Sequence, residues 1–332
     1  MQKKGERMKS LFTGIVITFL LISTISLAQE KSKEKISGVA YFDFTHNTAD
    51  NLVINNEFEF ERVYFAYENQ IADNLKYKFQ VDVGRSDDDS RLQVYLKNAK
   101  VDWKNSFGTI IIGLQGMNVF NIQEATWGHR FLEKSAMDKN KFASSADLAI
   151  GYSNSFSDNL HMSVLVSNGE GYKKPEGDKY KKISAQVAYG QTKLSSKDGF
   201  NLGGVFTYEP FDNEGVTEAK TVLGAFAGYA GSGLRTGVEF DTFTTGGTDL
   251  TKQIISLYAN YELNDLLQAF ARADIYDPNT DASDDGNNYL MGGIIWSPVK
   301  GLKIAPNVRY TSFQEDAKDE VTMFKVNFEF KF

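Results

Sequence analysis

A period-two alternation of apolar and polar residues recurs along most of the chain and indicates a β protein. The closing stretch 324–332, "FKVNFEFKF", places an apolar residue at every second position and a charged or amide residue between. Such a strand has one apolar and one polar face. A soluble sheet turns the apolar face to a protein core, whereas a transmembrane barrel turns it to lipid. This strand alone leaves both folds open.

Sixteen segments carry this alternation between turn residues, and the sequence therefore predicts sixteen strands. Several segments exceed the usual strand length of about 5–6 residues and match the roughly 9–11 needed to cross a bilayer at a tilt. A break in phase at Glu61 and Arg62 predicts a bulge in the second strand. The predicted strands are 36–45, 57–70, 75–84, 92–104, 107–115, 145–156, 159–168, 180–190, 199–208, 219–230, 233–245, 251–263, 266–276, 287–297, 301–313 and 320–332.

The links between the predicted strands are sorted by length. Links that follow even-numbered strands are short, such as "ADN" at 72–74 and "ND" at 264–265, apart from the longer "QTKLSSKD". Links that follow odd-numbered strands are longer and more polar, such as "GEGYKKPEGDK" and "PFDNEGVTEAK". Transmembrane barrels have short periplasmic turns and long outer loops, whereas a soluble sandwich has no reason for this asymmetry. The pattern predicts an all-β, sixteen-stranded antiparallel transmembrane barrel.

The first 28 residues have the three parts of a secretory signal peptide. A basic start, "MQKKGERMKS", is followed by the apolar run "LFTGIVITFLLISTIS" and by small residues at Ser26 and Ala28. We predict cleavage after Ala28, which leaves the barrel in 29–332. The removed segment carries four basic residues and one acid, so cleavage takes the net charge from −7 to −10. An acidic exported chain is a poor candidate for binding nucleic acid.

Composition excludes several kinds of chemistry. The chain has no cysteine, so thiolate metal sites, disulfides and a thiol nucleophile are absent. The three histidines, His46, His129 and His161, lie on different predicted elements, and no pair has zinc spacing. A Ser–His hydrolase within the barrel is an alternative that no serine context supports. We therefore expect no enzymatic activity and no cofactor.

The chain resembles a bacterial outer-membrane porin in its signal peptide, sixteen strands, sorted links and terminal phenylalanine. Within the porins, "GLQGMNVFNIQEATWGHRFLEKS" at 113–135 is most similar to the phosphate-selective porin O/P family. The resemblance implies localisation in the outer membrane, contact with lipid and lipopolysaccharide, and a homotrimer. It also implies that the terminal pattern is read by the barrel-assembly machinery, which would recognise Phe328, Phe330 and Phe332.

The longest link, about 116–144, is the third outer loop, and the porin resemblance implies that it folds inward as a constriction. In the resembled family, basic residues on this loop and on the wall attract anions. The acids on this loop depart from a purely basic pattern. The loop candidates are Arg130, Lys134, Lys139 and Lys141, with Glu124, Glu133 and Asp138. The wall candidates, predicted to face the lumen, are Lys76, Lys78, Lys97, Arg235, Arg272, Arg309 and Lys325.

Each loop charge has two interpretations, because an ion pair that anchors the loop to the wall uses the same residue types as a filter. Asp277, Asn279 and Asp281 have the spacing of a calcium loop, but Ala282 replaces the glycine and Asn288 replaces the final glutamate. A solvated acidic loop is the favoured interpretation there, and no metal is expected.

The sequence thus predicts a weakly selective porin through which small hydrophilic solutes diffuse. A preference for anions such as phosphate is what the family resemblance implies. Two alternatives stay open: a structural or adhesive outer-membrane barrel with a plugged lumen, and an exported soluble β protein.

Overall fold

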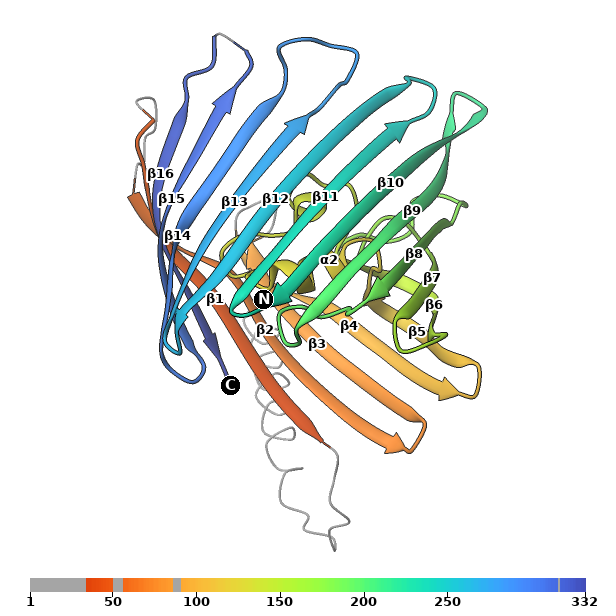
Figure 1. Cartoon of the computed structure of the whole chain (residues 1–332). Coiled ribbons are helices and arrows are strands. Elements are labelled where there is room, and N and C mark those ends of the chain that lie inside the picture. The colour runs from red at the N-terminus through yellow and green to blue at the C-terminus, as the bar shows by residue number, and fades with distance from the viewer. Residues whose placement is uncertain (1–33, 50–55, 86–90, 316) are drawn as a thin grey trace, which may run out of the picture. The chain divides into compact units, whose positions relative to one another are not determined.

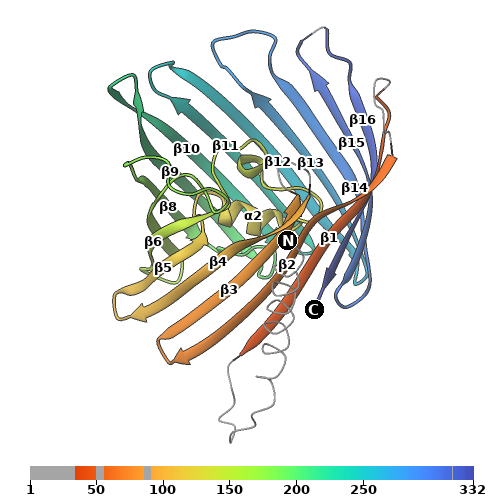
Figure 2. The same ribbon diagram turned by 180° about the vertical axis from the view of Figure 1, so that it is seen from behind.

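Sixteen antiparallel strands close into one barrel between Lys35 and Phe332 (Figures 1 and 2). The computed structural model describes residues 34–49, 56–85, 91–315 and 317–332, so the predicted signal peptide at 1–28 lies outside the described residues. Each strand pairs with its sequence neighbour, and β1 closes on β16. The strands are β1 (Lys35–Asn47), β2 (Asn56–Ala72), β3 (Leu75–Arg85), β4 (Leu92–Asn105), β5 (Gly108–Gly116), β6 (Ala146–Ser155), β7 (Leu160–Ser167), β8 (Lys182–Gly190), β9 (Gly199–Asn213), β10 (Val216–Gly231), β11 (Leu234–Thr245), β12 (Leu250–Asn264), β13 (Leu267–Asp277), β14 (Asn287–Val299), β15 (Leu302–Phe313) and β16 (Val321–Lys331).

All sixteen predicted strands are confirmed, and so is the bulge in the second. The register between β1 and β2 shifts where Tyr41 pairs with Arg62 and Phe42 pairs with Phe60, which leaves Glu61 as the extra residue. The insertion explains why the alternation in the sequence changes phase there.

The barrel is apolar outside and polar inside. On β8, the side chains of Ile183 and Val187 are each 44% exposed, whereas Ser184 is 0% and Gln186 is 3% exposed. The terminal strand follows the same rule, because Phe324 and Phe330 face outward and Asn327 is buried. An apolar exterior around a polar interior is the pattern of a transmembrane barrel. It contradicts the alternative of an exported soluble protein, since water would cover an apolar surface far larger than soluble proteins expose.

The two rims of the barrel differ, as the link lengths predict. Links after even-numbered strands lie at one rim, called here the short-turn rim, and both β1 and β16 have their outer chain ends there (Figure 1). The link after β9 is an exception, because the predicted loop "PFDNEGVTEAK" is a hairpin that turns at Glu214 and Gly215. Both residues have positive φ, 52° and 87°, as a tight primed turn requires.

Barrel closure involves the last residue. The backbone N–H of Phe332 donates to the carbonyl of Gly38 at 3.1 Å, and the Gly38 N–H donates back at 3.3 Å. The Phe332 ring lies so close to Gly38 that a Cβ atom there would clash with it. Among the described residues, no helix has the length and apolarity needed to cross a membrane.

Candidate constriction site

The link 117–145 folds into the barrel, where its two short helices, α2 (Asn121–Trp127) and α3 (Ala136–Lys139), lie inside the ring of strands (Figure 2). We call this segment the inner loop. Two apolar clusters dock it on the barrel wall. Met117, Phe120, Ile122, Met137 and Phe142 pack with Leu165, Val205, Phe226 and Ile254, and Trp127, Phe131 and Leu132 pack with Tyr258, Phe270, Tyr289 and Ile295. Burial of these side chains fixes the inner loop against β7 to β14.

Three wall arginines on alternate strands donate to backbone carbonyls of the inner loop between Trp127 and Lys134. Arg235 on β11 donates to the carbonyl of Trp127 at 3.1 Å. Arg272 on β13 donates to the carbonyl of Lys134 at 2.6 Å, and Arg309 on β15 donates to that of Leu132 at 2.6 Å. Each guanidinium is nearly or fully buried. These predicted wall candidates are therefore loop anchors, because each guanidinium donates to a backbone carbonyl of the inner loop.

Glu133 adds a side-chain anchor to the backbone contacts. Its carboxylate accepts from Arg309 Nη1 at 3.2 Å and from the Tyr289 hydroxyl at 3.1 Å. Burial by itself would raise the pKa of Glu133, but Arg309, Lys139 and Arg272 more than offset this effect and hold the pKa at about 2. Glu133 is therefore ionised at neutral pH and serves the anchoring that the sequence left as one of two roles.

Arg130 forms a network within the inner loop. Its guanidinium binds Glu124 on α2 and lies 2.8 Å from Asp138 on α3. Burial opposes the charge on Arg130, but Glu124, Tyr64 and Asp138 more than offset this and raise the pKa well above its usual value. Three of the predicted loop charges are thus brought together, and the positive charge of Arg130 is compensated by two carboxylates.

The three predicted loop lysines have different surroundings. Lys139 lies 2.9 Å from the centroid of the Tyr289 ring and 3.6 Å from Asp274, and burial lowers its pKa to about 8. Lys134 is half-buried, and among the described residues no carboxylate lies within ion-pair distance of its ammonium. Lys141 is exposed and has a φ of 60°.

The wall on the other side of the inner loop is charged. Arg62 on β2 binds Asp82 on β3, and the Tyr172 hydroxyl donates to Asp82 at 2.9 Å. Lys97 on β4 donates to Ser145 and lies 3.9 Å from the centroid of the Tyr172 ring. Lys97 is within electrostatic range of Arg62, Arg130, Asp82 and Asp138. Within the described part of the chain, Lys97 forms no ion pair with a carboxylate.

The other wall candidates are paired. Lys325 lies 3.0 Å from Asp43, while Lys76 and Lys78 lie 2.5 Å and 3.4 Å from Glu68. The Lys76 and Lys78 pairs stand toward the short-turn rim, away from the inner loop, because β3 starts at that rim. The predicted wall set thus divides into loop anchors, paired lysines and Lys97.

Sequence reasoning missed Arg62, Tyr64 and Tyr172, which lie close to Arg130 or Lys97. It also missed Glu61, which lies within electrostatic range of Lys134 and Lys325. The bulge at Glu61 hid the lumen-facing phase of β2, and Tyr172 comes from a link that carries no periodicity. Asp82 could have been found, since it shares the lumen-facing phase of Lys76 and Lys78.

A second segment enters the lumen from the short-turn rim. The link 191–198 between β8 and β9 buries Leu194, and the Ser195 N–H donates to the carbonyl of Ala125 on α2 at 3.2 Å. Asn201 on β9 donates to Thr126 at 3.1 Å. The inner loop is therefore held by the link 191–198 at the short-turn rim as well as by the strands of the wall.

The acidic link after β13 forms local turns. The N–H of Asn279 donates to the Asp277 carboxylate at 2.9 Å, and that of Asp281 donates to the Asn279 side chain at 3.2 Å. Within the described residues, no group of three His, Asp or Glu side chains is arranged to hold a metal ion.

Comparison with solved structures finds the same fold in bacterial outer-membrane channels. The chain is similar to an anion-selective porin from Comamonas acidovorans, with a TM-score of 0.68 and 14% identity over 91% of this chain and 100% of that one. It is also similar to the outer-membrane channel DcaP of Acinetobacter baumannii, with a TM-score of 0.66 and 12% identity over 92% and 99%. OmpT of Vibrio cholerae matches with a TM-score of 0.65 and 11% identity over 92% and 99%.

These likenesses establish a shared fold, a closed sixteen-stranded barrel. No family model matches the chain, and no curated protein sequence matches it.

Proposed function

We propose that this chain is a bacterial outer-membrane porin, a water-filled channel for passive diffusion of small hydrophilic solutes. The supporting observation is the docking of a charged inner loop inside the barrel. Arg235, Arg272 and Arg309 hold the loop against the wall, and Arg130 on the loop lies within electrostatic range of Lys97 on β4. A polar, charged interior within an apolar-coated barrel suits the passage of hydrated solutes.

A weak preference for anions such as phosphate is part of this proposal. Most charges of the inner loop and of the wall around it are paired, which limits selectivity. Lys97 and Lys134, however, form no ion pair with a carboxylate among the described residues. Positive charge that no ion pair neutralises would favour anions in the lumen. The similar porin from Comamonas acidovorans is described as anion-selective.

The test is a reversal potential in a KCl gradient across a planar bilayer. The wild type is expected to show an anion-shifted reversal, and the double variant Lys97→Gln/Lys134→Gln a shift toward neutrality. Lys141→Gln, an exposed lysine on the same loop, is the matched control. A neutral or cation-shifted reversal potential of the wild type would contradict the anion preference but not the proposal of a porin.

A plugged structural barrel is the second candidate, because the inner loop and the link 191–198 both occupy the lumen. Deletion of 121–141 separates the two. It would create conductance in a plugged barrel, whereas in a porin it would enlarge a conductance that already exists.

The proposal includes a homotrimer, in line with OmpT of Vibrio cholerae, one structure of which is of a trimer form. It also includes export through a signal peptide cleaved after Ala28, contact with lipopolysaccharide, and assembly by the barrel-assembly machinery. The mass of the purified protein tests the cleavage, and the mass of its unheated complex tests the trimer.

A further inference from the structure

A cavity lies at the short-turn rim, beside the inner loop. Its volume is about 700 Å³, within the range of small-molecule sites. The walls come from the turn between β4 and β5, from β6, β7 and β8, from the start of the link 191–198, and from the face of α2 made by Asn121, Ile122 and Ala125. We call this cavity the vestibule.

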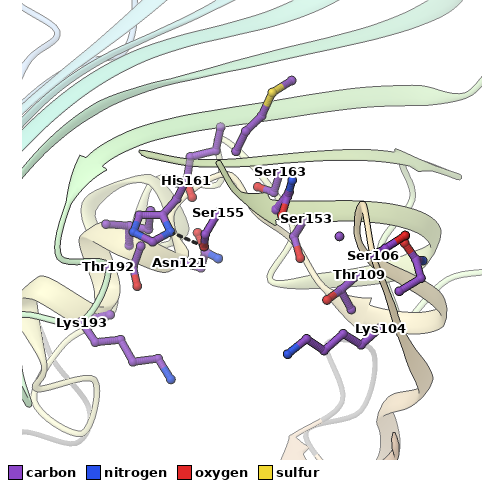
Figure 3. Close-up of a pocket in the computed structure, with 17 residues that line it drawn as sticks. Lys104, Ser106, Thr109, Asn121, Ser153, Ser155, His161, Ser163, Thr192 and Lys193 are labelled. Carbon is purple, nitrogen blue, oxygen red and sulfur yellow. Dashed lines mark hydrogen bonds between the residues drawn. The ribbon is translucent and has the colours of Figure 1, made fainter. Parts of the chain in front are cut away.

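The charge of the vestibule has one sign. Lys104 and Lys193 line it, and no aspartate or glutamate does. Figure 3 shows the two lysine side chains extending toward each other from opposite sides of the cavity. Neither forms an ion pair among the described residues. In a chain with more acids than bases, a cavity with two unpaired ammonium groups and no carboxylate favours an anion.

The rest of the lining suits a ligand with hydroxyl groups. Ser106, Thr109, Asn121, Ser153 and Thr192 line the vestibule, and their side chains make no hydrogen bond within the described residues. The hydroxyl and amide groups of these five side chains are therefore free to bond to a ligand.

His161 and Ser155 are already committed to each other. The Ser155 hydroxyl lies 2.7 Å from His161 Nδ1, and Nε2 lies 3.1 Å from the carbonyl of Gly190 (Figure 3). Because the carbonyl can only accept, Nε2 carries the proton and Nδ1 accepts from the hydroxyl. The two residues are cross-strand partners on β6 and β7, so this pair stiffens the wall of the vestibule.

We propose that the vestibule binds an anionic carbohydrate, a monosaccharide that bears one phosphate or carboxylate group. Lys104 and Lys193 bind the anionic group, the free hydroxyl and amide groups bind the sugar hydroxyls, and Ile122, Ala125 and Met162 contact the apolar face of the ring. The proposal rests on the proposed channel, since it names the class of solute that the channel collects at this rim.

Calorimetric titration of the detergent-refolded protein tests the site, with glucose 6-phosphate, glucose and inorganic phosphate as probes. Glucose 6-phosphate is expected to bind more tightly than either of the others. Lys104→Gln/Lys193→Gln should weaken its binding by at least about tenfold, the loss of roughly one charge-assisted hydrogen bond. Asn121→Ala should weaken binding of glucose 6-phosphate and leave that of inorganic phosphate unchanged.

Lys197→Gln, on the same link but outside the vestibule, is the matched control and should bind as the wild type does. Equal affinity for glucose 6-phosphate and inorganic phosphate, or unchanged binding in the double lysine variant, would overturn the site. Conductance of the same preparation is recorded separately. A barrel that binds glucose 6-phosphate but does not conduct ions would support the vestibule site and contradict the porin. A barrel that conducts ions but does not bind glucose 6-phosphate would support the porin and contradict the site.

Discussion

Arg309 on β15 and Glu133 on the inner loop form an ion pair inside the barrel, with Nη1 3.2 Å from Oε2. The same guanidinium donates to the carbonyl of Leu132 at 2.6 Å, so one wall residue holds both a side chain and the backbone of the loop. The position of the inner loop therefore depends on the guanidinium of Arg309, which is engaged by the loop and not available to a solute.

Replacing Arg309 with methionine should release this part of the loop. The change leaves the Glu133 carboxylate buried without its cation, which costs about 3 kcal/mol or more. Unfolding in guanidinium chloride, followed by the fluorescence of buried Trp127, measures the loss of stability. Current noise in single-channel recordings should also increase. Arg85→Gln breaks an exposed arginine–glutamate pair with Glu59 and should change stability far less, because solvent screens exposed pairs. Equal effects of the two variants would contradict the anchoring role.

Gly128 ends α2 in the left-handed region, with a φ of 72°. An alanine there would pay roughly 1–2 kcal/mol for this conformation, and its Cβ would lie 2.8 Å from Arg235 Nη2. Gly128→Ala should therefore destabilise the barrel more than Gly215→Ala, which has a φ of 87° but open space around the new methyl group. The difference between the two unfolding free energies measures the close packing of the loop end against Arg235 and Ser195. No difference would show that the loop end does not pack against these residues as described.

The ion selectivity should change near pH 8. The pKa of Lys139 is lowered to about 8 by burial, so this lysine loses its positive charge as the pH rises from 7 to 9. The pKa of this lysine is about 8 in the folded state and about 10.5 in the unfolded state. Between these two pH values only the unfolded state keeps the proton, so the stability of the folded state rises with pH. The anion preference, measured by reversal potential, should fall across this range in the wild type and should fall less in Lys139→Met. Lys141→Met should behave as the wild type does, and an equal pH response in Lys139→Met would assign the titration to other groups.

The terminal phenylalanine should matter for assembly in the cell more than for the stability of the barrel. Phe332→Ala keeps the backbone bonds to Gly38, so refolding in detergent should be nearly unchanged. If the assembly machinery reads this residue, the amount inserted in the outer membrane should fall severalfold. Phe324→Ala removes another outward phenylalanine of the same strand and is the control. Equal losses in both variants would argue against a terminal signal.

The strands could be predicted because alternation is a local property of the sequence. Lys76 and Phe79 take their faces from their positions in β3, whatever the rest of the chain does. The extension of β9 and β10 was missed because the turn at Glu214 and Gly215 is set by backbone conformation, and its polar flanks look like a loop.

The roles of the site residues could not be predicted, because they depend on where the inner loop docks. The sequence places Arg235, Arg272 and Arg309 on the lumen face, but a lumen-facing arginine can bind a solute or a carbonyl. Docking is decided by nonlocal apolar contacts, such as those of Trp127 with Tyr258 and Phe270. The sequence pattern carries no record of these contacts.

Single-channel recording of purified residues 29–332 in a planar bilayer tests the central claim most directly. We predict discrete, long-lived conductance steps from a preparation that circular dichroism shows to be a folded β-barrel. The same folded preparation passing no current at all would contradict the porin and leave the plugged structural barrel as the better account.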